Sequence, residues 1–291
     1  MAEKVLGVVG GSGLYAIDGL EDAVWRTVEG PWGKPSDQIL EGRIGDTKVC
    51  FLPRHGRGHV ESPSTINYRA NIDALKRCGV TDIISLSAVG SLREDLPPGT
   101  FVIVDQFIDR TFSRQKSFFG SGLVAHVPLS HPVSSWIGDI AEAGMEKLGI
   151  PHHRGGTYVV MEGPQFSTLA ESELYRSWGA SVIGMTNMPE AKLAREAEIR
   201  YATVAMVTDF DCWHPDHDSV DVALVIKTLH DNADKARALT KFMVESINAW
   251  ETEPTCGTDT VLDAALITTP EARDPAMVAK LDAVAGRVLG R

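Results

Sequence analysis

Short apolar runs alternate along the chain with longer segments of helical period. Residues 5–9 and 201–207 are almost entirely apolar, and residues 81–86 contain Ile83, Ile84 and Leu86, which is typical of strands buried on both faces of a sheet. Residues 68–78 and 222–250 carry apolar positions at helical spacing. The alternation predicts an α/β fold: a single three-layer domain with a central mixed, largely parallel β-sheet flanked by helices.

The remaining segments continue this alternation. Residues 38–44 and 47–52 are expected to form a hairpin closed at Gly45-Asp46. Thr168 and Glu171 have the spacing of a capping box, and Pro189 suits the first turn of a helix. We expect further strands at 100–105, 157–161 and 181–185, a helix at 133–148, loops at 87–91 and 109–122, a linker at 254–259 and a short helix from Asp274-Pro275.

Composition limits the possible partners. The chain has 291 residues and a formal net charge of −11, which argues against nucleic acid or an anionic membrane as a partner. No apolar run reaches the roughly 18 residues of a membrane span, and the apolar start is broken by glycines without a signal-peptide pattern. Four widely separated cysteines fit reduced thiols. We therefore expect a cytoplasmic protein without a structural metal.

Small or polar residues follow most of the expected strands. The loops that leave one edge of such a sheet converge, and ligands bind there. The candidates are Ser12, Arg54, His55, Ser87, Ala88, Glu162, Phe166, Met185, Thr186, Asp209 and Asp211.

Asp209-Phe210-Asp211 carries the most suggestive chemistry. Two carboxylates two residues apart on an extended chain point to the same side. Burial at a strand end raises a carboxyl pKa, and an acid protonated near neutral pH can donate to a leaving group. The alternative is that both aspartates are structural, capping the next segment or pairing with lysines.

Three other motifs are less specific. Gly11, Gly13 and Ala16 fit a dinucleotide fingerprint, but Gly-Pro breaks replace the required helix. The arginines and histidines of residues 53–59 favour anion binding over a solvated basic loop. The cluster from His214 to Asp218 lacks helical ligand spacing, so a solvated loop is favoured over a metal site.

Six motifs together resemble the methylthioadenosine phosphorylases of the trimeric purine nucleoside phosphorylase family. The resemblance covers about residues 5–248 and is loose beyond Trp250. The motifs, in chain order, are Gly10-Gly11-Ser12-Gly13-Leu14, Pro53-Arg54-His55-Gly56, Ser87-Ala88-Val89-Gly90-Ser91-Leu92, Asp105 to Thr111, Glu162 to Thr168 and Thr208 to Trp213.

The resemblance implies a nucleoside phosphorylase domain at 1–250 and, at 251–291, a linker and helical tail packed on the same or a neighbouring subunit. It implies phosphorolysis of methylthioadenosine without a cofactor, with inorganic phosphate as co-substrate, in a homotrimer or a dimer of trimers. Ser12, Arg54, His55, Ser87, Ala88 and Thr186 would then hold phosphate.

The nucleoside contacts are also implied by the resemblance. Phe166 would pack on the sugar or the base, and Met185 would hold the ribose hydroxyls. Asp209, Phe210 and Asp211 would form the base site, with Asp209 as the catalytic acid or hydrogen-bond acceptor. Relatives that use 6-oxopurines have Asn where Asp209 stands, so a 6-aminopurine is favoured. The specificity residues would be Ser167, Val220, Val222 and Val225, and His126, which would reach a neighbouring subunit's ligand.

Several points differ from the family pattern or stay open. Ser12 and Ser87 replace threonines of the animal members, Gln165 replaces a frequent arginine, and Val89 a frequent cysteine. A purine nucleoside phosphorylase of broader specificity, acting on adenosine or 6-oxopurine nucleosides, remains the main alternative. A dinucleotide-dependent oxidoreductase, a metal-dependent nucleoside hydrolase and a non-catalytic nucleoside receptor are the other hypotheses.

Overall fold

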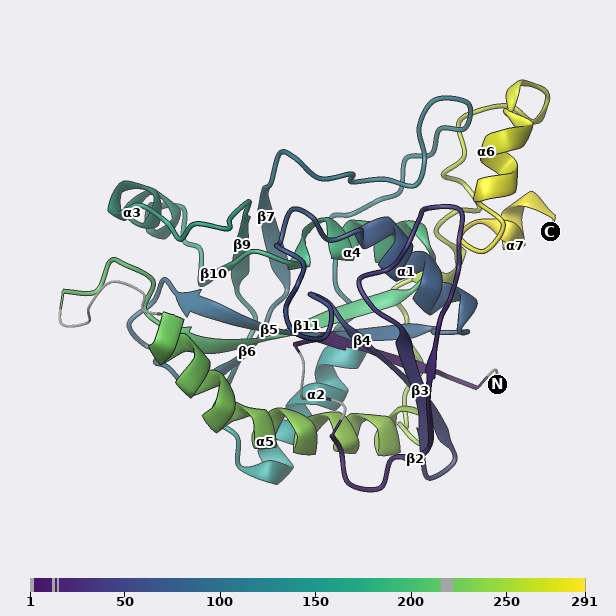
Figure 1. Ribbon diagram of the computed structural model, residues 1–291. Helices are drawn as coiled ribbons and strands as arrows, with labels where there is room; N and C mark the ends of the chain where they lie inside the picture. Colours follow the sequence, from purple (N-terminus) through teal and green to yellow (C-terminus); the bar gives the residue numbers. More distant parts are fainter. Residues whose placement is uncertain (1–2, 12–13, 15, 216–221, 291) are drawn as a thin grey trace.

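A mixed β-sheet of eleven strands, counted over the described part of the chain, runs through the molecule (Figure 1). The computed structural model describes residues 3–290 except 12–13, 15 and 216–221, and only the backbone of residues 222–225. The centre consists of three parallel strands, in which β5 lies between β1 and β11. Their bounds are β1 (Leu6–Gly10), β5 (Asp82–Ser91) and β11 (Arg200–Asp209). Every residue of β1 and β11 is buried, which confirms the interpretation of the apolar runs.

On one side of this centre, the sheet continues through an antiparallel hairpin. Strand β4 is parallel to β1, and β3 pairs with β4 around Gly45, whose positive φ closes the turn as the Gly45-Asp46 pair predicted. The outermost strand, β2, is largely exposed, and its lack of an apolar run explains why the sequence did not reveal it. These strands are β2 (Glu21–Arg26), β3 (Ile39–Ile44) and β4 (Thr47–Pro53).

Strand β5 also pairs with β11 and β10. Strand β11 pairs with β5 from Asp82 to Gly90, and the last two residues of β5 also pair antiparallel with β10. The expected loop at 87–91 is therefore wrong, because Gly90 and Ser91 still have a strand partner. From β10 the sheet continues to β9 and then to β7. From β11 it continues to β6 and then to β8. Their bounds are β6 (Phe101–Ile103), β7 (Gln106–Arg110), β8 (His152–Arg154), β9 (Thr157–Met161) and β10 (Val182–Gly184).

The edge strands account for two further errors. Asp109 and Arg110 belong to β7 and not to the loop expected at 109–122. Strand β8 was not predicted either, because its three residues are His-His-Arg and carry no apolar signal. Short strands at a sheet edge need no apolar alternation, since backbone pairing with the neighbouring strand holds each one in place.

Helices cover both faces of the sheet, as expected for three layers (Figure 1). Helices α1 and α4 pack together on one face, and α2 and α5 on the other. Helix α3 lies apart, next to β9 and β10, and begins with the predicted capping box between Thr168 and Glu171. The bounds are α1 (Tyr68–Arg77), α2 (Ser135–Leu148), α3 (Leu169–Ser177), α4 (Asn187–Glu196) and α5 (Val222–Ile247). No described helix has the length and apolarity to cross a membrane.

The tail after residue 250 packs on its own chain. It contains two short 3₁₀ turns and two short helices, α6 (Pro275–Lys280) and α7 (Gly286–Leu289). Leu262, Leu281 and Val284 are buried in the same apolar core as α1 and α4. Arg287 donates to Glu198 at 2.8 Å, which fixes the end of the tail near α4.

Candidate active site

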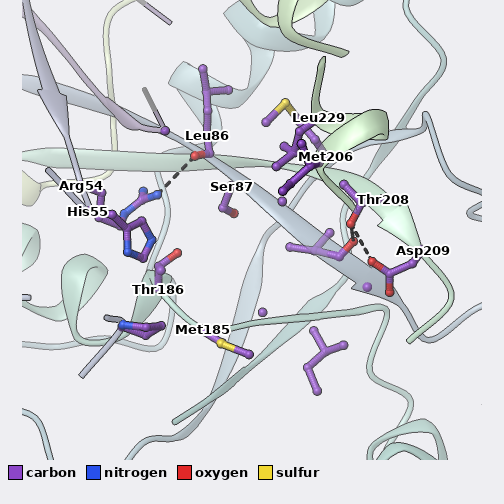
Figure 2. Close-up of a pocket in the computed structure, with 18 of the residues that line it drawn as sticks. Arg54, His55, Leu86, Ser87, Met185, Thr186, Met206, Thr208, Asp209 and Leu229 are labelled. Carbon is purple, nitrogen blue, oxygen red and sulfur yellow. Dashed lines mark hydrogen bonds between the residues drawn. The ribbon is translucent and has the colours of Figure 1, made fainter. Parts of the chain in front are cut away.

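A cavity of about 460 Å³ lies along the second half of β5 and at the ends of β10 and β11, where α5 covers it. Loops after β4 and β10 complete its wall. Figure 2 shows Arg54, His55, Ser87 and Thr186 at one end, and Thr208 with Asp209 at the other. The predicted site residues that line it are Arg54, His55, Ser87, Ala88, Phe166, Met185, Thr186, Asp209 and Asp211. The strand-end argument therefore brings together most of the residues that it singled out, but Glu162 pairs with Arg114 and does not line the cavity.

Arg54 does not stand in the cavity as a free cation. Its side chain is only 2% exposed, and it forms an ion pair with Glu190 of α4, with Nε at 2.7 Å from one carboxylate oxygen and Nη2 at 3.0 Å from the other. Nη2 also donates to Ser85 Oγ at 2.5 Å, and Nη1 to the carbonyl of Leu86 at 3.3 Å. These bonds leave one N–H of Nη1 for a ligand. The two formal charges cancel, so anion binding at this end depends mainly on neutral donors.

His55 is held in its neutral form. Its Nδ1 lies 2.8 Å from the carbonyl oxygen of Glu61, which can only accept, so Nδ1 carries the proton. Burial lowers the pKa of His55 to about 4, and the Arg54 charge acts in the same direction. The ring stacks on His59 with 4.1 Å between centroids. Nε2 is then an acceptor, suited to a hydroxyl of a protonated phosphate or of a ribose.

Two hydroxyls stand beside Arg54 and His55. Ser87 Oγ donates to Asn187 Oδ1 at 3.2 Å. Thr186 precedes α4 as its N-cap residue, but its side chain makes no capping hydrogen bond. Both line the cavity together with Ala88 and Gly11. Ser12 lies outside the described residues.

Asp209 ends β11 at the far end of the cavity. Its carboxylate accepts from Thr208 Oγ1 at 2.7 Å and from the backbone N–H of Asp211 at 2.8 Å. Both bonds favour the ionised form, but burial outweighs them and raises the pKa of Asp209, with the charge of Asp211 adding to the effect. The side chain is 9% exposed, so a ligand can reach it.

Asp211 reaches the same cavity by a different route from the one predicted. It does not continue an extended strand but lies in the turn after β11, with a left-handed φ of 52°. Burial raises its pKa as well, and the hydroxyls of Ser172 and Ser167 oppose this. A turn therefore places the second carboxylate beside the first, whereas the sequence analysis expected the pleat of an extended strand to do so.

Between the two polar ends the cavity wall is apolar. Phe166, which is 45% exposed, and Met185 belong to this wall, as predicted. The sequence analysis did not single out the rest, which comes from the loop after β1, from α5 and from strands that carry methionine. These residues are Leu14, Met161, Met206, Ile226 and Leu229.

Other predicted site residues lie elsewhere. Phe210 is buried and packs its ring on Trp213 and His214, outside the cavity lining. Ser167 Oγ lies 3.7 Å from Met161 Sδ, just behind the wall. His126 lines a second cavity, with Lys116 and Lys192. Val220 lies outside the described residues, as do the side chains of Val222 and Val225.

Three functional candidates escaped the sequence analysis. Glu190 neutralises Arg54, Thr208 donates to Asp209, and His230 of α5 lines the cavity. No local pattern marked Glu190, because its partner lies 136 residues away in the sequence. The spacing of His230 on its helix was compatible with a solvated face and gave no signal.

Among the described residues, one group has the composition and spacing of a metal site, and it is remote from this cavity. It consists of Glu41, Cys50 and Cys78, none of which lines the cavity. Glu41 also pairs with Lys48 at 3.5 Å. The cluster from His214 to Asp218 lies partly outside the described residues.

The chain matches the model of the phosphorylase superfamily over residues 5–245. It is 67% identical over 288 residues to an S-methyl-5'-thioadenosine phosphorylase of Rhodospirillum rubrum, covering 99% of this chain and 98% of the relative. The enzyme of the same name from Cereibacter sphaeroides is 62% identical over 287 residues, covering 99% of both chains. The tail is therefore shared with these relatives.

Solved structures show the same similarity. A methylthioadenosine phosphorylase from an antarctic soil metagenomic library is 46% identical, with a TM-score of 0.92, and the match covers 98% of this chain and 99% of that one. A mutant adenosine/methylthioadenosine phosphorylase of Schistosoma mansoni, solved with adenine, is 37% identical with a TM-score of 0.82, covering 86% and 93%. The chain therefore belongs to the phosphorylase superfamily.

Proposed function

We propose that this protein catalyses the phosphorolysis of S-methyl-5'-thioadenosine, giving adenine and 5-methylthioribose 1-phosphate. One observation carries the proposal. A single cavity has neutral anion-binding donors at one end, buried carboxylates at the other and an apolar wall with methionines between them. The names of its relatives support this choice of substrate.

Phosphate binds at the end formed by His55, Ser87 and Thr186. The hydroxyls donate to its oxygens, and Arg54 adds one N–H. His55, neutral with its proton on Nδ1, accepts a hydrogen bond at Nε2 from a hydroxyl of phosphate or of the ribose. Neutral donors in a partly desolvated site orient the anion without a buried excess charge.

The base binds at the end formed by Asp209 and Asp211. A phosphate oxygen attacks the anomeric carbon, the glycosidic bond breaks, and its electron pair moves onto the purine. An acid near N7 neutralises the negative charge that develops there. The raised pKa of Asp209 supports the role of proton donor. The other oxygen of the Asp209 carboxyl accepts from the 6-amino group, with Asp211 beside it.

The alternative is a nucleoside phosphorylase of broader specificity. A carboxylate accepts from a 6-amino group, whereas a 6-oxo group would face it with a second acceptor. A site built around one hydrogen-bonding pattern rejects the wrong one by up to about 10⁴-fold. At the sugar end, the apolar wall leaves a 5′-hydroxyl without a partner at a cost of roughly 1–3 kcal/mol. Adenosine is therefore proposed to be a slow substrate.

We further propose that the enzyme uses no cofactor and acts in the cytoplasm as a homotrimer. In that assembly His126, which lies away from its own chain's main cavity, reaches the 5′ end of a neighbour's ligand. Size-exclusion chromatography with light scattering tests the assembly, and His126→Ala tests the contact. A monomer with full activity would contradict both.

Comparing the substrates directly tests the function. Release of the free base is measured from each substrate with and without inorganic phosphate: adenine from methylthioadenosine and adenosine, and hypoxanthine from inosine and methylthioinosine. The proposal predicts that methylthioadenosine is preferred and that turnover depends wholly on phosphate. Equal use of inosine would favour the broader enzyme, and release without phosphate would indicate a hydrolase.

A further inference from the structure

Tyr158 of β9 carries a buried hydroxyl without a partner. The side chain is fully buried, and its hydroxyl makes no hydrogen bond to the part of the chain that the structure describes. A buried tyrosine hydroxyl normally has a partner, because leaving it unsatisfied costs about 1–3 kcal/mol. This one therefore calls for an explanation.

The hydroxyl lies directly behind the phosphate end of the cavity. A Cβ placed on Gly184, which lines the cavity, would lie 2.0 Å from the Tyr158 oxygen. Only glycine at this position leaves room for the hydroxyl. Ser87 and Thr186 approach it closely enough to lower its pKa, against burial, which raises the pKa to about 12. Tyr158 is thus a neutral donor placed behind both hydroxyls.

We propose that Tyr158 is a positioning residue for phosphate, acting through the hydroxyls of Ser87 and Thr186; this rests on the proposed function. In this structure Ser87 Oγ directs its proton at Asn187 Oδ1, at 3.2 Å. To bind phosphate, it turns that proton toward the anion. Its lone pairs then accept from Tyr158, which gives the chain Tyr158 O–H, Ser87 O–H, phosphate oxygen. Each bond in such a chain polarises and strengthens the next.

The proposal predicts opposite effects on stability and on phosphate binding. In Tyr158→Phe the ring still fills its site and one unsatisfied hydroxyl is removed. The phosphate-free protein should melt at the same temperature or higher. The KM for phosphate should rise roughly 3- to 10-fold, as expected for one lost hydrogen bond, while the KM for methylthioadenosine stays unchanged. The rise in melting temperature caused by inorganic phosphate should shrink in parallel.

Tyr68→Phe is the matched control for stability. The Tyr68 hydroxyl is buried but bonded, donating to the Pro63 carbonyl at 2.9 Å and accepting from Arg114 Nη1 at 3.2 Å. Its removal should lower the melting temperature of the phosphate-free protein. A similar fall in Tyr158→Phe would show that its hydroxyl has a structural partner and would overturn the proposal.

A double-mutant cycle tests the route. In a Ser87→Ala, Thr186→Val background, adding Tyr158→Phe should change the phosphate KM by less than about 2-fold, because the coupling is gone. The inference would be refuted if Tyr158→Phe still changed the phosphate KM fully in this background. It would also be refuted if Tyr158→Phe alone left the phosphate KM unchanged. A wild type that releases adenine without phosphate would instead refute the proposed function.

Discussion

Replacing Arg54 with alanine should destabilise the protein as well as weaken phosphate binding. The guanidinium is buried against Glu190, with bonds of 2.7 and 3.0 Å, and it also bonds to Ser85. Removing one partner of a buried pair leaves an uncompensated charge and typically costs about 3–5 kcal/mol. One kcal/mol shifts the melting temperature of a large domain by about 2–4 °C, so a fall of roughly 6–20 °C is expected.

Calorimetry combined with phosphate kinetics separates the two roles of Arg54. Arg54→Ala should lose stability and show a raised phosphate KM. In Arg54→Met with Glu190→Leu, apolar side chains replace both charges, which is often neutral for stability. This double variant should regain most of the melting temperature while the phosphate KM stays high.

The outcome that would refute this reasoning is specific. If Arg54→Ala melts within about 2 °C of the wild type, less than 1 kcal/mol is lost, and the ion pair contributes little. If the double variant recovers phosphate affinity together with stability, Arg54 acts only through the fold and its remaining N–H has no ligand.

Two further predictions concern pH. The folded pKa of His55, about 4, lies below its ordinary value of 6.5; the unfolded chain therefore binds more protons between these values, and stability should fall as pH drops through that window. Urea unfolding at pH 5 and 7 should show this loss reduced in His55→Gln, and an unchanged loss would contradict a neutral His55. Burial raises the pKa of Glu196 to about 7 from 4.5, so this residue should cost stability as pH rises from about 4.5 to 7. In Glu196→Gln, thermal melts should show that cost removed at pH 8, and a less stable variant there would count against it.

The central fold and the gathering of the site were predictable from local signals. The apolar runs that became β1 and β11 are buried along their whole length, and parallel strands bring their ends to one edge. This accounts for Arg54 after β4 and Asp209 at the end of β11. Ser87 and Thr186 share the cavity for other reasons, because Ser87 lies inside β5 and Thr186 follows β10, which runs antiparallel to β5.

What the sequence did not reveal depends on partners far along the chain. Glu190 neutralises Arg54 from 136 residues away, and no local pattern marks such a pair. Ser91 stays in a strand because Val182 pairs with it, although its small, polar surroundings suggested a loop. Asp211 reaches the site through a left-handed turn. Aspartate tolerates this conformation, but an aspartate in the sequence does not predict it.

The central claim is that Asp209 recognises and protonates a 6-aminopurine that phosphate displaces. The most direct measurement is the ratio of kcat/KM for methylthioadenosine to that for methylthioinosine, in the wild type and in Asp209→Asn. Thr208 can rotate to accept from the new amide while donating to the Val89 carbonyl, 3.2 Å away, so the fold should be kept. Losing a general acid costs about 10²–10⁴-fold, so the account predicts a fall of at least about 100-fold in methylthioadenosine phosphorolysis and a shift of the ratio toward methylthioinosine. An unchanged ratio would contradict it.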